Sequence, residues 1–213
     1  MGKKKQIGKM LLALVGIILV GTGVSFNAAA SLGNDSVGIM YDGIRNTANF
    51  SSAQLGMASN IVNIVLVIVV FFLERHYVNI GTFIYIIPYG IVVDFGGKLY
   101  RTLFPIQTLP TQIIGAAMGC LLLYIGVAMF ITADIGLDPF TGMVMVIRDK
   151  VGKEYRIVKI FFDIACIIIG FALGGKIGVI TIITALSAGP VIQFFADLMK
   201  KLIEKKVSNE EIN

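Results

Sequence analysis

Six apolar stretches, each close to the length of a bilayer-spanning helix, constrain the fold of this chain more than any other feature. A helix rises ~1.5 Å per residue, so about 20 apolar residues cross a hydrocarbon core of ~30 Å. Hydrophobic residues make up 56% of the 213 residues and charged residues only 15%, which is too few to cover a soluble globule. The sequence therefore predicts an all-α integral membrane protein. The predicted spans are residues 10–30, 54–73, 79–97, 113–133, 157–173 and 177–199.

The basic residues predict how the chain is oriented in the membrane. If the N-terminus lies inside, 14 of the 18 Lys and Arg residues fall on the cytoplasmic side. The four left outside are Arg45, Lys98, Arg101 and Lys176. Such an excess follows the positive-inside rule, so we expect both termini in the cytoplasm. It also accounts for the net charge of +5 without nucleic acid as a partner.

The two halves of the chain repeat one pattern. Residues 23–45 align without gaps with residues 126–148 at an offset of 103, and eight of the 23 positions are identical. The same offset places Asn60 on Asp163, and an offset of 99 aligns the third span with the sixth. Because each half holds three spans, an odd number, the second half must enter the membrane inverted. A duplication retained only for fold stability is the alternative, and it does not imply transport.

The predicted fold is six transmembrane helices in two inverted-topology three-helix repeats, each with a short re-entrant or interfacial helix. The first apolar run follows three lysines, as in a signal peptide. Its removal would destroy the repeat, so we expect it to be retained. The predicted organisation is a cytoplasmic N-terminus (1–9), a first repeat (10–104), a second repeat (105–199) and a cytoplasmic tail (200–213).

A glycine and an aspartate follow the first and fourth spans at the same spacing, Gly33 with Asp35 and Gly136 with Asp138. Glycine permits backbone conformations that other residues avoid, and an aspartate caps the first N–H groups of a helix. The pattern predicts that a new helix begins directly after each aspartate.

These new helices are expected over residues 36–46 and 139–150, the second with Pro139 at its first position. Both are too short to span a bilayer. Irregular backbone at membrane depth is tolerated only where protein buries it or where it lines a wet cavity. The two capping aspartates and the neighbouring Asp134 are therefore candidate binding residues. The alternative is that the aspartates only cap helices at the membrane surface.

The third and sixth spans carry proline and glycine at aligned positions, Pro88 with Gly90 and Gly189 with Pro190. Proline removes a helix hydrogen bond and kinks the chain. Paired interruptions in corresponding spans point to a central site in transporters, so we expect broken helices here. Kinks that serve packing alone are the alternative.

Three polar residues lie well inside apolar spans. Asn60 and Asn63 are three residues apart and share one helix face, while Asp163 lies in the fifth span. An aspartate at the centre of a bilayer costs ~2.5–3.5 kcal/mol on insertion scales, so Asp163 should face the protein interior with a partner. It is our first candidate for proton, cation or amine binding. A purely structural hydrogen bond to Asn60 or a threonine is the alternative.

No pattern in the sequence indicates an enzyme, a cofactor or a metal centre. Cys120 and Cys166 lie in apolar runs and are interpreted as small buried hydrophobes, and the single histidine, His76, lies in a short loop. Common catalytic and phosphate-binding motifs are missing from the sequence.

The segments ITADIGLDPFTGM (131–143) and GGKIGVITIITALSAGPVIQFF (174–195), with degenerate copies in the first half, resemble the YczE/YyaS/YitT family of bacterial membrane proteins. The resemblance covers about residues 10–198, and the chain looks closer to the short YczE/YyaS-type members that lack a soluble C-terminal domain. It implies a multi-pass protein of the bacterial plasma membrane and specifies no substrate.

Two functions compete at this point. The first is a small secondary transporter or exporter, in which Asp163 and Asn60 form a site between the repeats and Asp35 and Asp138 shape its gates. The second is a non-transporting subunit or scaffold of a larger complex. The expected surroundings are the lipid bilayer, an unidentified small molecule or ion, and either a second copy of the chain or a partner subunit.

Overall fold

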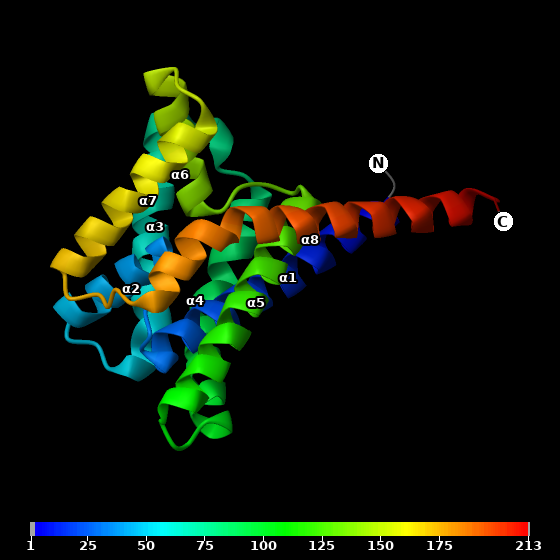
Figure 1. Ribbon diagram of the computed structural model, residues 1–213. Coiled ribbons are helices and arrows are strands. Elements are labelled where there is room, and N and C mark those ends of the chain that lie inside the picture. The colour runs from blue at the N-terminus through cyan, green and yellow to red at the C-terminus, as the bar shows by residue number, and fades with distance from the viewer. Residues whose placement is uncertain (1–2, 213) are drawn as a thin grey trace.

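The computed structural model describes residues 3–212, and side chains from 6 to 203, so the basic clusters at Lys3–Lys5 and Lys205–Lys206 lie outside the described side chains. The described backbone forms helices joined by short turns, without strands, in agreement with the predicted all-α class. The helices are α1 (Lys3–Ala30), α2 (Ser36–Thr47), α3 (Leu55–Glu74), α4 (Ile80–Leu103), α5 (Leu109–Ala133), α6 (Pro139–Val151), α7 (Tyr155–Ala172) and α8 (Val179–Ile212), with 3-10 turns η1 (Ser52–Gln54) and η2 (Arg75–Tyr77) (Figure 1).

Five helices of the described chain are long and apolar enough to cross a membrane, namely α1, α3, α4, α5 and α8. The remaining predicted span, the fifth (residues 157–173), corresponds to α7, which has only 18 residues. Three of these are charged, Arg156, Lys159 and Asp163. By length and composition, α7 therefore differs from the other five.

Helices α1 and α5 pack closely at two glycine contacts. A Cβ on Gly16 would lie 2.8 Å from the carbonyl oxygen of Gly126, and one on Gly23 would lie 2.6 Å from that of Gly119. Small residues allow two helix backbones to approach this closely within a membrane. Helix α4 packs on α1, and α8 packs on α5, so this crossing is the centre of the fold.

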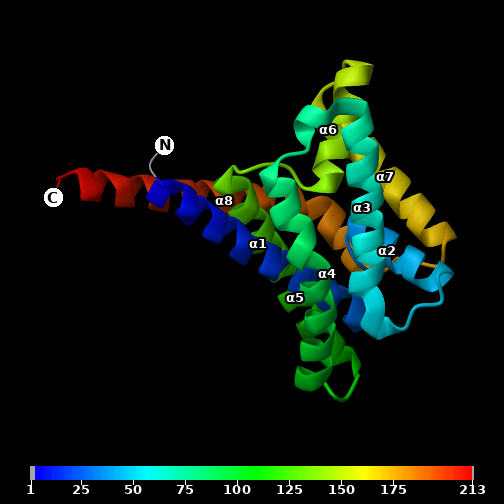
Figure 2. The same cartoon turned by 180° about the vertical axis from the view of Figure 1, so that it is seen from behind.

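The two short helices cross over between the halves of the chain. Helix α2, from the first half, packs on α7 of the second, and α6 of the second half packs on α3 of the first (Figure 2). Gly43 of α2 lies directly against the backbone of Gly170 in α7. The observed bounds of α2 and α6 extend the predicted ones by a single residue each.

The breaks before α2 and α6 confirm the predicted role of the two glycines. Gly33 has φ +103° and Gly136 has φ +151°, conformations that L side chains rarely adopt. The residues that end the preceding helices, Ser31 and Asp134, are also left-handed, with φ of 59° and 49°. The chain therefore leaves each long helix through a left-handed turn and starts a new helix within a few residues.

The breaks predicted at Pro88 and at Gly189–Pro190 are wrong. Helix α4 runs continuously from Ile80 to Leu103, and α8 continues through Pro190 to Ile212, into the segment predicted as a tail. A proline removes only one hydrogen bond, and packed neighbours and local adjustment keep such helices intact.

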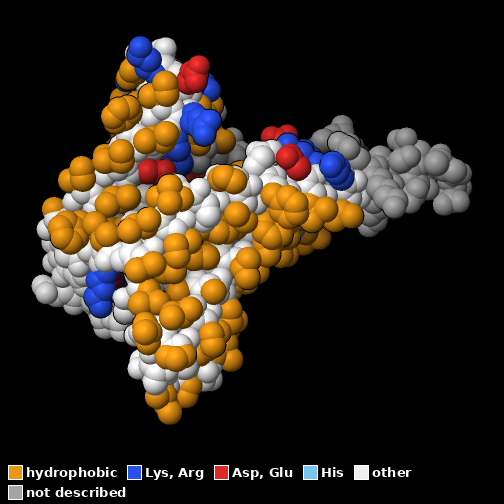
Figure 3. Space-filling model, in the orientation of Figure 1, with side chains coloured by type: hydrophobic (Ala, Val, Ile, Leu, Met, Phe, Trp, Pro, Cys, Tyr) orange, Lys and Arg blue, Asp and Glu red, His pale blue; other side chains and the backbone are white. Residues whose placement is uncertain are grey.

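Apolar side chains cover most of the face seen in Figure 3, whereas charged groups gather mainly along its upper edge. The most exposed large hydrophobic residues include Phe72, Leu186 and Ile91, at 81%, 75% and 72%. Extended apolar surfaces are rare on soluble monomers, so this one suits contact with lipid. Helices α7 and α8 diverge from the turn that joins them, and in Figure 1 the far ends of α1 and α8 extend toward the same side.

Candidate functional site

The candidate site is centred on Asp163, whose carboxylate joins α7 to α2. Lys159 Nζ lies 2.5 and 2.6 Å from its two oxygens, and the Ser36 hydroxyl donates to the first of them at 2.8 Å. Lys159 and Asp163 are one helical turn apart on α7, and their side chains are 35% and 31% exposed. The prediction that Asp163 faces a partner is confirmed, but its partners are Lys159 and Ser36 rather than Asn60 or a threonine.

Asp35 lies next to Ser36 and caps α2, accepting a hydrogen bond from the Gly38 N–H at 3.3 Å. It is near enough to Asp163 and Lys159 for their charges to act on it. Desolvation, followed by the charge of Asp163, raises the pKa of the Asp35 carboxyl from 3.8 to about 6. This carboxyl can therefore exchange a proton near neutral pH.

Asp138 caps α6 in the equivalent way. Its carboxylate accepts hydrogen bonds from the N–H groups of Phe140 and Thr141 at 3.1 and 3.0 Å. Asp138 also acts electrostatically on Lys159. Both capping aspartates, at the start of one short helix from each half, therefore belong to the surroundings of the Asp163–Lys159 pair.

Buried tyrosines form the wall beside these aspartates. Tyr85 and Tyr89 stack with ring centroids 4.8 Å apart, and Tyr41 packs at 6.0 Å from Tyr89 and 5.7 Å from Phe140. The Tyr41 hydroxyl donates to Asn63 Oδ1 at 3.2 Å. The wall thus joins α2, α4 and α6 and places Asn63 of α3 at its edge.

Asn60 does not reach Asp163. Its amide lies directly against Gly90 of α4, where any Cβ on the glycine would overlap it. Within the described side chains, Asn60 Oδ1 and Asn63 Nδ2 are buried and lack a hydrogen-bond partner. The prediction that Asn60 and Asp163 form one site is not supported by this arrangement.

Asp134 is not part of the central site. Its side chain is 87% exposed, and its carboxylate lies 3.5 Å from Lys9 Nζ. It ends α5 in a left-handed conformation, so it shapes the turn at the surface. The four positions expected to break α4 and α8 also contribute no polar group to the site.

Sequence reasoning missed Lys159 and Ser36. The first left a clear signal, because Lys159 and Asp163 are spaced i, i+4 and so share a helix face. The charge count had assigned Lys159 to the cytoplasmic surface instead. Ser36 carried no such signal, since 127 residues separate it from its partner.

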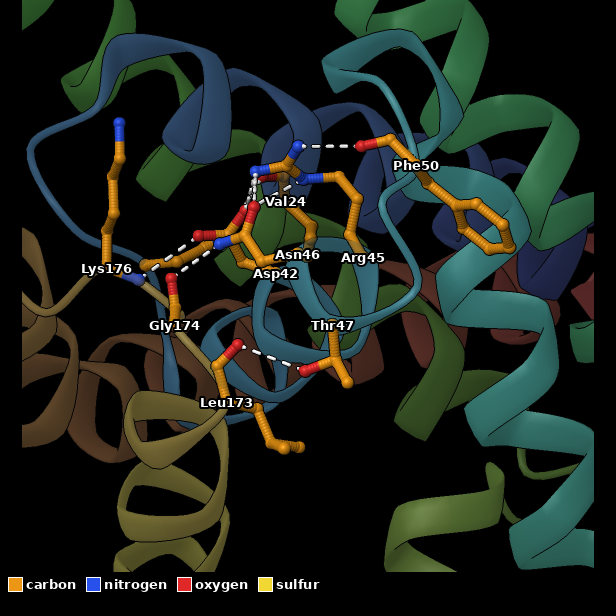
Figure 4. Close-up of polar contacts among 10 residues, drawn as sticks. Val24, Asp42, Arg45, Asn46, Thr47, Phe50, Leu173, Gly174 and Lys176 are labelled. Atoms are coloured by element: carbon orange, nitrogen blue, oxygen red, sulfur yellow. Dashed lines mark hydrogen bonds and ion pairs between the residues drawn. The ribbon is translucent and has the colours of Figure 1, made fainter.

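A second polar network, also missed, holds the end of α2 to the turn between α7 and α8 (Figure 4). Arg45 binds one carboxylate oxygen of Asp42 at 2.7 and 3.0 Å, and the other oxygen accepts the Lys176 N–H at 3.1 Å. Asn46 donates to the Gly174 carbonyl at 2.5 Å, and Thr47 donates to the Leu173 carbonyl at 3.2 Å. This network fixes the position of α2 beside Asp163.

Neither cysteine is available as a ligand at this site. Cys120 and Cys166 are free and buried, as expected. In the part of the chain that the structure describes, no group of three His, Cys, Asp or Glu residues could hold a metal ion. The charged and hydroxyl groups of Asp163, Lys159 and Ser36 offer ion pairing, proton exchange and hydrogen bonding.

Comparisons with known proteins bear on the class of the molecule. Residues 7–197 match a family described as "Family of unknown function (DUF6198)". An uncharacterized protein of Haemophilus influenzae is 27% identical over 198 residues, covering 93% of this chain and 86% of the relative. The uncharacterized membrane protein YczE of Bacillus subtilis is 27% identical over 120 residues, covering 56% and 54%.

No solved structure matches the chain. The similarity to YczE agrees with the resemblance that the sequence motifs indicate. With the apolar helices, it identifies this chain as a membrane protein with transmembrane helices.

Proposed function

We propose that this chain, which belongs to the DUF6198 family of unknown function, is a small secondary transporter of the bacterial plasma membrane. Its ligand site would lie between two inverted halves. The observation that carries the proposal is the Asp163–Lys159 ion pair, which Ser36 ties to the start of α2. Charged side chains within membrane segments are expensive and usually mark ion or substrate pathways. This pair is only partly buried, so a small ligand can reach it.

Packing at the centre of the fold supports the inverted repeat. The offset of 103 relates Gly16 to Gly119 and Gly23 to Gly126. In the structure Gly16 lies against Gly126 and Gly23 against Gly119, so the two contacts are copies of one another. The same offset relates α2 to α6 and α3 to α7, so the packing of α2 on α7 and that of α6 on α3 are also copies of one another. A two-fold axis in the membrane plane would relate both sets.

The left-handed turns support the same symmetry. Gly33 lies against the backbone of Gly178, just before α8, and Gly136 lies against Asn79, just before α4. The offset of 99 relates Asn79 to Gly178. Each turn therefore contacts the start of the third long helix in the opposite half.

We extend the proposal to six spans with both termini in the cytoplasm. Helix α7 is shorter than the other five and carries three charged residues, but Asp163 and Lys159 neutralise each other and Asp163 accepts a hydrogen bond from Ser36 of α2. A paired charge that faces protein is the form in which membrane segments accommodate ionisable residues. The charge asymmetry of the loops supports this orientation.

The two halves differ in a way that suits alternating access. In the first half α3 packs on α4, with Asn60 against Gly90. The repeat relates these residues to Asp163 and Gly189, yet a Cβ on Gly189 would meet nothing within 4 Å. The first half is thus closed and the second open. In the opposite state, α7 would close on α8 and carry Asp163 toward Gly189.

A cationic ligand or a proton would act by competing with Lys159 for the Asp163 carboxylate. A ligand or proton that occupies this carboxylate also weakens its hydrogen bond from Ser36, and so loosens the tie between α7 and α2 that closure must break. Asp35, whose pKa is raised to about 6, is a second group that can take up the proton. We assign no catalytic reaction to the chain.

Reconstitution tests the proposal. The full chain in liposomes that enclose a pH-sensitive dye should move protons in response to a pH gradient, alone or with one member of a screen of amines, metabolites and ions. The variant Asp163→Asn should abolish this flux, and Lys150→Gln, an exposed change of one charge, should not. A complete absence of flux and binding across the screen would contradict transport. Such a result together with a co-purifying ATPase or coupling protein would favour the alternative of a non-transporting subunit.

A further inference from the structure

A polar cavity lies between α1, α2 and α4, away from Asp163. We call it the outer vestibule and define it by its polar lining and floor: Ser25, Asp42, Arg45, Asp94, Gly97 and Arg101. It has an empty volume of about 400 Å³, including the part open to solvent.

Two charged groups of the vestibule are already satisfied. Arg45 binds the Asp42 carboxylate and also donates to the Phe50 carbonyl at 3.2 Å and to Asn46 Oδ1 at 2.7 Å. The second oxygen of Asp42 accepts the Lys176 N–H. This neutral pair, whose side chains are 16% and 13% exposed, forms a rigid floor.

Arg101, in contrast, has its guanidinium donors unused. Among the described side chains it has no ion pair within 4 Å, and its guanidinium makes no hydrogen bond. Its Nη1 lies 3.7 Å from the place where a Cβ on Gly97 would be, so the side chain folds back along α4 into the vestibule. The bare glycine surface leaves room in front of it. A planar guanidinium with unused donors matches the two oxygens of a carboxylate or phosphate.

The remaining charge also favours an anion. Asp94 is the other carboxylate of the vestibule, and it is held by the Gly56 N–H at 2.6 Å. Lys98 lies one turn along α4 from it, and Lys176 lines a smaller pocket that shares Asp42 with the vestibule. With Asp42 and Arg45 neutralising each other, the lining keeps one arginine, Arg101, and one carboxylate, Asp94, and Lys98 and Lys176 add two positive charges nearby. Of the four basic residues that the predicted topology leaves outside, Arg45 and Arg101 line the vestibule, and Lys98 and Lys176 lie close to its carboxylates.

We propose that the outer vestibule binds a small anion through a carboxylate or phosphate group, with Arg101 as its main ligand. The site is separate from Asp163, so it does not depend on the proposed transport function. The same chemistry has two sources, a free metabolite or the headgroup of an anionic lipid.

The chain has no tryptophan, which allows a specific test. The variant Ser52→Trp places a single indole on the vestibule wall. The full-length protein in phosphatidylcholine nanodiscs is titrated with inorganic phosphate and with succinate, against sodium chloride of equal ionic strength. Equilibrium dialysis of radiolabelled phosphate with the tryptophan-free protein shows that the reporter does not create the binding.

We expect a saturable change in fluorescence on addition of the anion. The variant Arg101→Gln should weaken the affinity for the anion by about tenfold or more. Arg101→Lys should restore only part of it, because lysine lacks the planar fork. The matched control Arg75→Gln removes an exposed arginine in η2 and should leave binding unchanged. Since Arg101 makes no contact that folding depends on, its variants should unfold at the same temperature as the parent.

A second arm separates the two sources. If a lipid headgroup is the ligand, phosphatidylglycerol nanodiscs should change the emission without added anion, and Arg101→Gln should remove that change. An anion response in phosphatidylcholine instead assigns the site to a free anion. The proposal is overturned if neither arm gives a response, or if Arg101→Gln responds like the parent protein.

Discussion

Lys159 and Asp163 form a two-pronged ion pair on α7, with Nζ 2.5 and 2.6 Å from the two carboxylate oxygens. Replacing Asp163 with Asn leaves a lysine without its counter-ion and removes the charged acceptor of Ser36. Loss of a charge-assisted partner typically costs about 1–3 kcal/mol, and partial exposure places this case at the lower end. We expect Asp163→Asn to lower Tm by several degrees in detergent.

A double variant separates the ion pair from other effects of the substitution. Lys159→Met combined with Asp163→Leu removes both charges and should recover much of the lost stability, because no charge is left alone. Circular dichroism on heating measures both variants. The single variants Lys159→Met and Asp163→Leu complete the cycle. If the loss of stability in the double variant equals the sum of the losses in these two, the side chains do not interact.

The pKa of Asp35 predicts a pH dependence of stability. Its pKa is about 6 in the folded protein and close to 3.8 when unfolded, so the folded state holds the proton more tightly. The contribution of Asp35 to stability is therefore full below about pH 4 and is lost as pH rises through about 6.

The variant Asp35→Asn isolates this contribution, since asparagine also caps helices well. The Tm of the variant, relative to that of the parent, should rise between pH 4 and pH 6 and stay level above that. If the Tm values of the variant and the parent run parallel between pH 4 and pH 6, the result contradicts a raised pKa of Asp35. Flux measured across the same range would show whether the proton on Asp35 is also used in transport.

Short-range signals in the sequence were sufficient for the helices and their caps. Asp35 and Asp138 cap the two short helices as predicted, because capping depends on residues within a single turn. Gly33 and Gly136 have positive φ for a similarly local reason. The breaks predicted at Pro88 and Pro190 are wrong because the loss of one hydrogen bond does not end a helix whose flanking residues stay paired.

The site itself depends on contacts that the sequence pattern does not contain. Ser36 meets Asp163, and Asp42 meets the backbone of Lys176, only because α2 crosses onto the second half of the chain. Alignment of the repeats suggested Asn60 as the partner of Asp163, but equivalent positions in an inverted repeat need not touch. They occupy matching places on opposite sides of the molecule.

The glycine contacts between α1 and α5 predict a sharp positional effect. A Cβ on Gly23 would lie 2.6 Å from the Gly119 carbonyl oxygen and from the Leu123 backbone nitrogen, neither of which can move alone. We expect Gly23→Val to prevent folding or to destabilise the protein by more than about 3 kcal/mol. Gly8→Val, on the same helix with nothing within 4 Å, is the matched control. Monodispersity on size-exclusion chromatography distinguishes the two, and equal behaviour would contradict the tight crossing.

The contrast between Gly90 and Gly189 predicts a variant that separates folding from function. A side chain on Gly90 overlaps the Asn60 amide, so Gly90→Val should reduce Tm strongly. Gly189 is exposed and has no neighbour within 4 Å, so Gly189→Val should fold and unfold like the parent protein. If α7 must close on α8 during transport, the added methyl groups would obstruct the approach of Asp163. The Gly189→Val variant should then lose flux in liposomes while its Tm stays unchanged, whereas full flux would exclude closure at this position.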